Sequence, residues 1–324
     1  MRLPGRLAPA TPTRLARSVP GRLALVALAA GALAAGTLAG WFAPGQAATA
    51  AAGTTGASAQ ITAATLRPRT SAPSGVHALG AALENQQTGQ LLWSRAANTK
   101  RPIGSITKVM TALVVLRAGD LNRELTVSQA AVSYAHENDG STAGLHAGDR
   151  LTPEQLLEAM LVPSGCDAAY VLASAYGPGI PAFVAKMNAL ARQLGLGHTH
   201  FANADGLPVP TEHSTYSTPA DLLVIARDAM TYPMFRAIVA AHRVALPAGP
   251  GHHAYIWHTT NQLISKYPGI TGIKTGSTLA AGYCLLFADQ RSSGTLIGVV
   301  LDSSPTSRAV SFTDAEQLLN WGFG

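Results

Sequence analysis

Three short motifs, each occurring once and in a fixed order, constrain this chain more than any other feature. They are Ser105-Ile-Thr-Lys108, Ser164-Gly-Cys166 and Lys274-Thr-Gly276. Lysine is scarce, with five in 324 residues, yet two of the five fall in these motifs. A serine and a lysine three residues apart, then Ser-x-polar, then Lys-Thr-Gly on a strand, is the layout of an acyl-transfer serine enzyme that works without histidine.

Ser105 is predicted to be the nucleophile and Lys108 its general base. The centre of the segment from Ser105 to Arg117 is apolar on every side, which predicts a buried helix. Lys108 lies one turn after Ser105 on the same face, and burial disfavours the ammonium, so the amine can take the serine proton. A Ser cap with Lys108 reaching out to water is the structural alternative.

The other two motifs supply the remaining groups of the predicted site. Ser164 is suited to relay a proton between Lys108 and a leaving amine, although a simple helix cap at this turn is the alternative. Lys274 and Thr275 offer a cation and a hydroxyl donor, which suit a substrate carboxylate. Gly276 is expected to let a ligand backbone approach the strand edge. Lys274 as an ordinary edge-strand charge is the alternative reading of the third motif.

The formal net charge of +6 does not predict a nucleic-acid partner. Five arginines and no acid lie in residues 1–50, and the rest of the chain has 18 basic and 17 acidic residues. A nearly neutral body lacks the electrostatic footprint of a DNA- or RNA-binding protein. The 47% hydrophobic content is enough for a large core, in one domain or two lobes.

Residues 1–50 are predicted to be an export signal or an N-terminal anchor. The arginines precede the uncharged segment Leu23–Phe42, Pro44-Gly45 breaks it, and Ala48-Thr49-Ala50 offers the small residues that a signal peptidase reads. The apolar segment is 20 residues long, enough to span a bilayer if it is not removed. Either way we expect an extracytoplasmic protein, in the cell wall or secreted, with membrane contact only through this segment.

The remainder divides into a linker and one catalytic domain. Residues 51–75 are rich in Ala, Thr, Gly, Ser and Pro without periodicity, which predicts a flexible tether. Residues 76–324 form the predicted catalytic domain. Its two cysteines, Cys166 and Cys284, are too few for a disulfide scaffold, and two free thiols are favoured over a pair.

The pattern along residues 76–324 predicts an α+β fold. We expect a sheet built from both ends of the chain, with a helical lobe inserted in the middle. The predicted strands are Ala78–Leu83, Gln90–Ser94, Gly272–Thr275, Gly282–Ala288 and Thr295–Leu301. The predicted helices are Ser105–Arg117, Thr152–Leu161, Ala168–Ala175, Ala182–Leu194, Pro219–Met230 and Thr313–Trp321.

These motifs resemble the penicillin-binding D-alanyl-D-alanine carboxypeptidase family, the low-molecular-mass serine DD-peptidases. The likeness runs from about His77 to Gly324. The segments that carry it, besides the three motifs, are Arg101-Pro-Ile-Gly-Ser-Ile-Thr-Lys-Val-Met-Thr-Ala-Leu113, Phe201-Ala-Asn-Ala-Asp-Gly-Leu207, Tyr216-Ser-Thr-Pro-Ala-Asp221, Thr260-Asn261, Tyr267-Pro-Gly269 and Ala281-Gly-Tyr-Cys284.

The resemblance implies a five-stranded antiparallel sheet flanked by helices, plus a helical lobe, with the active site between them. It implies that Ser105 forms an acyl-enzyme with peptidoglycan stem peptides ending in D-Ala-D-Ala, and that penicillins and other β-lactams acylate it. Water would complete a carboxypeptidase reaction, and a second amine a transpeptidase reaction. It also implies an oxyanion hole from the backbone N–H groups of Ser105 and Ser277, with Ser277 and Cys166 in contact with substrate.

The chain departs from the family pattern in two places. The second motif normally reads Ser-x-Asn, but Cys166 occupies the third position, and a thiol cannot replace both ends of an amide. Many relatives continue into a β-rich C-terminal domain, which we do not expect here because the chain ends at Gly324.

Two other functions remain as alternatives, and no cofactor or metal is expected. A serine β-lactamase would use a glutamate after the second motif, but only Glu212 and Glu316 follow Ser164, in unmatched contexts. A non-catalytic relative that binds penicillin or the cell wall is the second alternative. His198-Thr-His200 and His252-His253 lack the helical spacing of a zinc pair and are read as loop residues.

Overall fold

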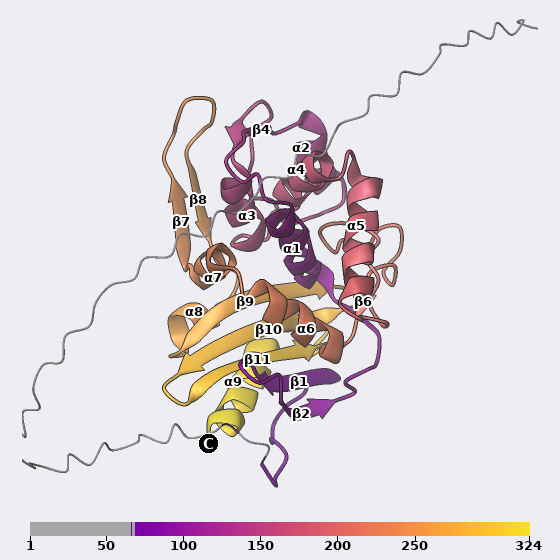
Figure 1. Ribbon diagram of the computed structural model, residues 1–324, viewed down its shortest axis with the longest axis vertical. Coiled ribbons are helices and arrows are strands. Elements are labelled where there is room, and N and C mark those ends of the chain that lie inside the picture. Colours follow the sequence, from indigo (N-terminus) through magenta and orange to yellow (C-terminus); the bar gives the residue numbers. More distant parts are fainter. Residues whose placement is uncertain (1–65, 67–68) are drawn as a thin grey trace, which may run out of the picture. The chain divides into compact units, whose positions relative to one another are not determined.

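A five-stranded antiparallel sheet forms the base of the molecule. The computed structural model describes Leu66 and residues 69–324 of the chain. The strands lie in the order β2-β1-β11-β10-β9, as Figure 1 shows. Their bounds are β1 Gly80–Asn85, β2 Leu91–Arg95, β9 Ile270–Thr278, β10 Gly282–Arg291 and β11 Gly294–Leu301.

Strands from the two ends of the chain lie side by side in this sheet. β1 pairs with β11, with Gly80 opposite Leu301 and Asn85 opposite Leu296. The predicted sheet from both ends of the chain, and the predicted α+β class with five antiparallel strands, are therefore confirmed. The strand edges differ from the predicted ones by a few residues, mostly because β9 and β10 are longer.

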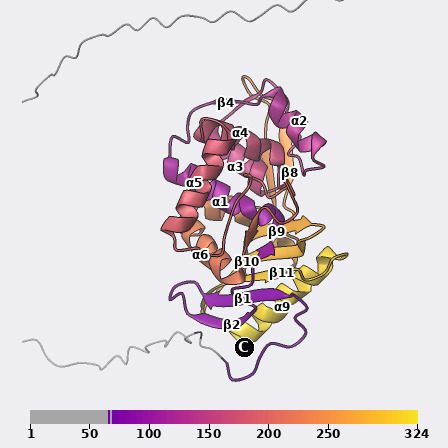
Figure 2. The ribbon, with the colours of Figure 1, turned by 90° about the vertical axis from the view of Figure 1, so that its right-hand side faces the viewer.

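Alternate residues of the strands enter two separate cores, because successive side chains of a strand point to opposite faces. On β10, Leu286 and Ala288 join the core shared with the helical lobe, whereas Leu285 and Phe287 face the other side. There they meet the C-terminal helix α9 (Arg308–Phe323). Figure 2 shows the sheet between α9 and the other helices. Burial on both faces explains why β10 and β11 are almost continuously apolar.

The helical lobe is built from the middle of the chain. Most of it lies above the sheet in Figure 1, and helix α6 (Pro219–Ala229) lies in front of the sheet. Within it α6 packs on β1 and β11, and α7 packs on β9. Its helices are α1 Lys108–Ala118, α2 Gln129–Glu137, α3 Pro153–Leu161, α4 Cys166–Tyr176, α5 Ile180–Gln193, α6 Pro219–Ala229 and α7 Pro233–Ala240. Its short strands are β3 Arg101–Pro102, β4 Leu125–Thr126, β5 Arg150–Leu151, β6 Tyr216–Ser217, β7 Arg243–Leu246 and β8 Tyr255–His258. The short helix α8 (Leu263–Lys266) packs on β9, and its Leu263 joins the core beside α9.

The helix predicted from Ser105 begins differently from the prediction. Residues Gly104–Thr107 form a 3₁₀ turn, η1, and the α-helix starts only at Lys108. Gly104 has φ of +51°, so the chain enters η1 through a left-handed residue. Ser105 therefore lies in a tight turn before the helix and not within its first α-helical turn.

The predicted linker is partly packed against the domain. Residues 1–50, the predicted export segment, lie outside the described residues, as does most of the linker. Leu66, however, is buried in the core beside α9, and the Trp321 indole N–H donates to the carbonyl of Ser71 at 2.7 Å. The packed unit thus includes residues before the predicted boundary at residue 76.

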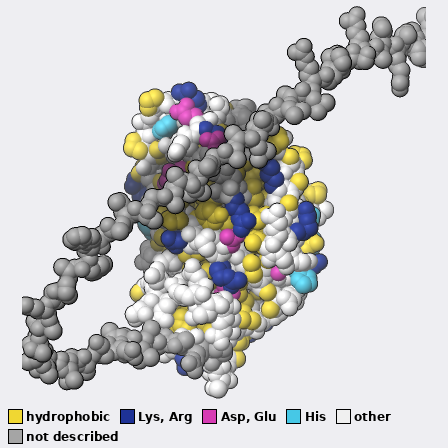
Figure 3. Space-filling model, in the orientation of Figure 1, with side chains coloured by type: hydrophobic (Ala, Val, Ile, Leu, Met, Phe, Trp, Pro, Cys, Tyr) yellow, Lys and Arg dark blue, Asp and Glu magenta, His cyan; other side chains and the backbone are white. Residues whose placement is uncertain are grey.

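On the face of the molecule that Figure 3 shows, basic and acidic side chains are intermixed.

No single helix among the described residues is long and apolar enough to cross a membrane. Only α4 and α5 taken together meet that length and composition, and they are bent by 87°.

Candidate active site

The Ser105 turn packs directly against strand β9. Gly104 has no side chain, and a Cβ there would lie 2.7 Å from the backbone nitrogen of Ser277. Glycine at 104 therefore brings the backbone of η1 and the backbone of β9 together. This contact places Ser105 beside Ser277. The family resemblance implies that the backbone N–H groups of these two residues form the oxyanion hole.

Lys108 is fully buried, and its Nζ atom contacts three different segments of the chain. Its Nζ donates to Ser105 Oγ at 2.9 Å, to the carbonyl of Asp205 at 2.9 Å and to Cys166 Sγ at 3.4 Å. The alternative in which Lys108 reaches out to water is therefore wrong. Ser105 does not cap a helix with its side chain either. The serine and lysine of the first motif are held in direct hydrogen-bond contact.

The loop that presents the Asp205 carbonyl is fixed by glycine and asparagine. Gly206 has φ of +85°, and a Cβ there would lie 1.9 Å from the carbonyl oxygen of Gly104. Asn203 accepts from the Gly206 N–H at 2.7 Å and donates to the Leu207 carbonyl at 2.8 Å. The Asp205 carboxyl is 2% exposed, and this burial raises its pKa, partly opposed by the charge of Lys108.

Ser164 is held in an unusual backbone conformation at the pocket wall. Its φ is +72°, a region that costs a non-glycine residue energy and is found often at functional sites. The cap position of α4 is Gly165 and no side chain caps that helix, so Ser164 is not the helix cap. Its hydroxyl is left to face the pocket.

Cys166 is the first residue of α4 and is almost completely buried. Its N–H donates to the carbonyl of Ser141 at 2.7 Å, and a Cβ on Gly140 would lie 3.1 Å from its sulfur. Burial raises the pKa of the thiol. The hydrogen bond that the structure gives to the Cys166 side chain is with Lys108, at the inner edge of the pocket.

Lys274 is buried behind the pocket wall. β9 is an edge strand, but Lys274 is only 1% exposed, so it is not an exposed charge that protects the edge. Its Nζ donates to the Thr275 carbonyl at 3.1 Å. Burial, and then the charge of Lys108, hold the pKa of Lys274 well below its usual value. Thr275 itself lines the pocket, and its hydroxyl is 2.6 Å from that of Thr260.

Gly276 has a different role from the one that the sequence suggested. A Cβ at this position would lie 2.3 Å from the carbonyl oxygen of Ile103 and 3.1 Å from the Ile106 side chain. The space that the glycine leaves is therefore filled by the Ser105 turn of the same chain, and not reserved for a ligand backbone. Gly276 still lines the pocket with its own backbone.

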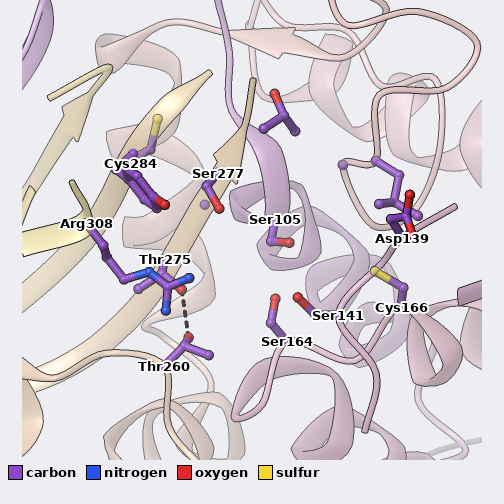
Figure 4. Close-up of a pocket in the computed structure, with 15 residues that line it drawn as sticks. Ser105, Asp139, Ser141, Ser164, Cys166, Thr260, Thr275, Ser277, Cys284 and Arg308 are labelled. Carbon is purple, nitrogen blue, oxygen red and sulfur yellow. Dashed lines mark hydrogen bonds between the residues drawn. The ribbon is translucent and has the colours of Figure 1, made fainter. Parts of the chain in front are cut away.

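Segments from both lobes enclose one pocket of about 170 Å³ around Ser105. Figure 4 shows Thr275, Thr260 and Arg308 on one side of Ser105, and Asp139, Ser141 and Cys166 on the other. The residues around it are Ser105, Asp139, Ser141, Ser164, Cys166, Gly206, Leu207, Thr260, Thr275, Gly276, Ser277, Thr278, Tyr283, Cys284 and Arg308. Of the predicted site residues, Lys108 and Lys274 lie behind this lining and the others are part of it.

Arg308 and Asp139 are pocket residues that the sequence did not reveal. Arg308 begins α9, which was predicted to start five residues later, at Thr313, so Arg308 lay outside the predicted helix. Asp139 follows α2, a helix that was not predicted. The sequence did give a reason to expect Thr260 near the site, because Thr260-Asn261 is one of the segments that resemble the family.

Neither cysteine forms a disulfide, which confirms the prediction of two free thiols. Cys284 lies in β10 as predicted, and burial raises the pKa of its thiol to about 12. Among Leu66 and residues 69–324 no three His, Cys, Asp or Glu side chains are grouped to hold a metal ion.

Comparisons with known proteins agree with the motifs and the fold. A family model described as D-alanyl-D-alanine carboxypeptidase matches residues 67–305. The D-alanyl-D-alanine carboxypeptidase of Streptomyces sp. strain K15 is 41% identical over 260 residues, which cover 76% of this chain and 88% of that protein. The D-alanyl-D-alanine carboxypeptidase DacB2 of Mycobacterium tuberculosis is 37% identical over 241 residues, covering 73% of this chain and 79% of that protein.

Solved structures give the same result for the fold. The crystal structure of the Streptomyces K15 DD-transpeptidase matches with a TM-score of 0.73 and 39% identity, over 78% of this chain and 99% of that one. The crystal structure of a D-alanyl-D-alanine carboxypeptidase from Mycobacterium tuberculosis matches with a TM-score of 0.70 and 33% identity, over 79% and 95% of the two chains.

Proposed function

The chain belongs to the D-alanyl-D-alanine carboxypeptidase family, and we propose that it is an exported serine enzyme acting on peptidoglycan stem peptides that end in D-Ala-D-Ala. The observation that carries the proposal is the contact of 2.9 Å between Lys108 Nζ and Ser105 Oγ in a pocket between the two lobes. A serine needs an adjacent base to become nucleophilic. In this pocket the adjacent group is a lysine and not a histidine.

Acylation begins when Ser105 Oγ attacks the carbonyl carbon of the penultimate D-Ala and Lys108 takes its proton. The carbonyl oxygen gains negative charge, which the N–H groups of Ser105 and Ser277 stabilise. The peptide C–N bond then breaks, and Ser164 passes a proton to the leaving amine. D-Ala departs and the rest of the donor remains as an ester on Ser105. The close packing of Gly104 on Ser277 supports this pairing of N–H groups.

The terminal carboxylate of the donor is proposed to bind at the Arg308 side of the pocket. Arg308 is the charged pocket residue on that side, and the paired hydroxyls of Thr260 and Thr275 add donors. Lys274 lies behind Thr275 and donates to its carbonyl, which helps to position Thr275 at the pocket wall. Arg308 thus takes the direct contact with the carboxylate that the sequence analysis had assigned to Lys274.

Breakdown of the ester by water gives a carboxypeptidase, and breakdown by the amine of a second stem peptide gives a transpeptidase. Penicillins present a strained amide to the same serine, so we propose that they acylate Ser105 and block the pocket. Export is proposed from residues 1–50, whose basic, apolar and small-residue order is that of a secretory signal.

The test is release of D-Ala from an N-acylated peptide ending in D-Ala-D-Ala, with and without glycine as an acceptor. Free D-Ala without a new peptide indicates hydrolysis, and a glycine-terminated product indicates transfer. The Ser105→Ala variant should release no D-Ala above the background of buffer alone. Equal release by this variant would overturn the proposal.

A further inference from the structure

The two sides of the active-site pocket carry opposite charge. Arg308 lies on one side, with the hydroxyls of Thr260 and Thr275, and Asp139 lies on the opposite side, with Ser141 and Cys166 (Figure 4). Ser105 lies between them. The Arg308 side suits the terminal carboxylate of the donor peptide. The N-terminal part of the bound donor therefore extends from Ser105 along the opposite side of the pocket, where Asp139 lies.

Asp139 is held in place by packed chain that follows it. Its φ is +49°, which brings it out of α2 in a left-handed conformation. The next residue, Gly140, donates to the Ala135 carbonyl at 2.8 Å and packs on the sulfur of Cys166. The Ser141 carbonyl then accepts from the Cys166 N–H at 2.7 Å. The backbone of Asp139 is thus held at a fixed position of the pocket wall.

The segment after Ser141 is fixed as well. The buried carboxylate of Asp167 accepts from the Thr142 hydroxyl at 2.6 Å, the Ala143 N–H at 2.9 Å and the Leu145 N–H at 3.2 Å. The wall that carries Asp139 is therefore tied to the start of α4, which also carries Cys166 and follows Ser164.

Asp139 has no cationic partner in the part of the chain that the structure describes, where the ion pairs all involve other residues. Its side chain is exposed to the pocket. An exposed carboxylate that a fixed backbone carries at a pocket wall, without an ion-pair partner, is suited to bind a cation from the ligand.

We propose that Asp139 recognises an ammonium group carried by the acyl-donor peptide on the N-terminal side of the scissile bond. The inference rests on the proposed function and specifies its substrate: stem peptides with a free side-chain amine are the preferred donors. With the carboxylate at Arg308 and the scissile carbonyl at Ser105, the donor chain runs past Cys166 toward Asp139.

An acceptor amine does not fit the same place. An acceptor must reach the ester on Ser105 from the position that D-Ala has vacated, which is the Arg308 side. Its amine also has to be uncharged to attack. Asp139 lies on the side occupied by the acyl group.

The test compares two donor peptides that end in D-Ala-D-Ala and differ only in whether their side-chain amine is free or acetylated. The measured quantity is the ratio of kcat/KM for the free-amine donor to that for the acetylated donor. We expect the unaltered protein to prefer the free amine about three- to tenfold, the range of an exposed to partly buried charge pair. Asp139→Asn should bring the ratio close to one.

Two controls separate this role from a structural one. Asparagine is nearly isosteric and tolerates a positive φ, so Asp139→Asn keeps the loop conformation. Glu137→Gln removes an exposed acid at the end of α2 that does not line the pocket, and should leave the ratio unchanged. Added salt should lower the ratio for the unaltered protein and not for Asp139→Asn, because ionic strength screens a charge pair.

The outcomes are distinguishable. Equal kcat/KM for the two donors with the unaltered protein, or the same ratio in Asp139→Asn, would overturn the inference alone. So would a change in Asp139→Asn confined to the partition between glycine transfer and hydrolysis, which would assign Asp139 to the acceptor. No D-Ala release from either donor would overturn the proposed function, and this inference with it.

Discussion

Lys108 receives its hydrogen-bond partners from segments far apart in the chain. Ser105 belongs to the turn before α1, the Asp205 carbonyl to the loop after α5, and the Cys166 sulfur to the start of α4. Removing Lys108 Nζ would leave the buried Asp205 carbonyl and Cys166 sulfur without this donor, whereas a larger cation would have to fit among the same groups. On the proposed mechanism the decisive property of the residue is that its amine can lose a proton.

Lys108→Arg is therefore expected to be nearly as damaging as Lys108→Ala. Arginine keeps the charge but does not deprotonate in a protein, so it cannot act as the base. Both variants should lower kcat/KM for D-Ala release by at least about a hundredfold, the size of a general-base contribution. The measurement is steady-state D-Ala release, with circular dichroism as the check on folding. The base role would be wrong if a folded Lys108→Arg protein kept more than about a tenth of kcat/KM, which corresponds to a loss of less than ~1.4 kcal/mol in transition-state stabilisation.

The motif residues could be found from the sequence because their chemistry follows local spacing. Ser105 and Lys108 are one turn apart, and Ser164 and Thr275 belong to short fixed patterns. Arg308 and Asp139 could not be found, because only the tertiary fold brings them to the pocket. Gly276 was predicted to allow a close approach of backbone. The structure has such an approach, but the backbone is that of Ile103 and not that of a ligand.

Among the helices, those with strong start signals were predicted well. Thr152 caps α3 with a reciprocal capping box to Gln155, and Thr218 caps α6. α6 therefore begins at the predicted residue, and α3 begins one residue after its predicted start, with Thr152 as its cap. α2 and α7, of nine and eight residues, were missed. α7 has no side-chain cap to mark its start, whereas α2 was missed although Ser128 caps it. The 3₁₀ turn before α1 was missed because its geometry depends on the contact of Gly104 with β9, which no local pattern encodes.

Glu158 on α3 should make stability depend on pH. Burial, with repulsion from Glu154 one turn earlier, raises the pKa of Glu158 to about 7. The folded state thus holds this proton more tightly than the unfolded chain. The resulting stability is present below about pH 4.5 and is lost as the pH rises through about 7.

Glu158→Gln should therefore stabilise the protein at pH 8 and have little effect at pH 4.5. Because Glu158 is only partly buried, we expect a gain on the order of 1 kcal/mol, or about 2–4 °C in Tm. Thermal unfolding of the two proteins at both pH values is the measurement, and Glu154→Gln should give a smaller effect of the same sign. An equal difference in Tm at pH 4.5 and pH 8 would contradict the argument.

At the scale of the whole molecule, the sheet joins the two ends of the catalytic unit and the pocket lies where the helical lobe meets it. The sequence predicted this arrangement, because strand-like segments occur at both ends with helices between them. It did not predict where the packed unit begins. Leu66 packs against Gly294 of β11, and Trp321 of α9 donates to the Ser71 carbonyl.

A chain starting at Leu66 should accordingly be more stable than one starting at Val76. Loss of a buried leucine and of one exposed hydrogen bond is expected to cost about 2–3 kcal/mol. Urea unfolding at 25 °C measures the difference. D-Ala release per folded molecule should be the same for both, because the missing segment packs beside α9 and not at the pocket. Equal free energies of unfolding would show that these contacts contribute nothing.

The central claim, a covalent acyl-enzyme on Ser105, is tested most directly by intact-mass analysis after treatment with penicillin. The unaltered protein should gain the mass of one penicilloyl group, and peptide mapping should place it on Ser105. The Ser105→Ala variant, folded as judged by its Tm, should gain no mass. A penicilloyl adduct on Ser105→Ala, or on a residue other than Ser105 in the unaltered protein, would contradict the account.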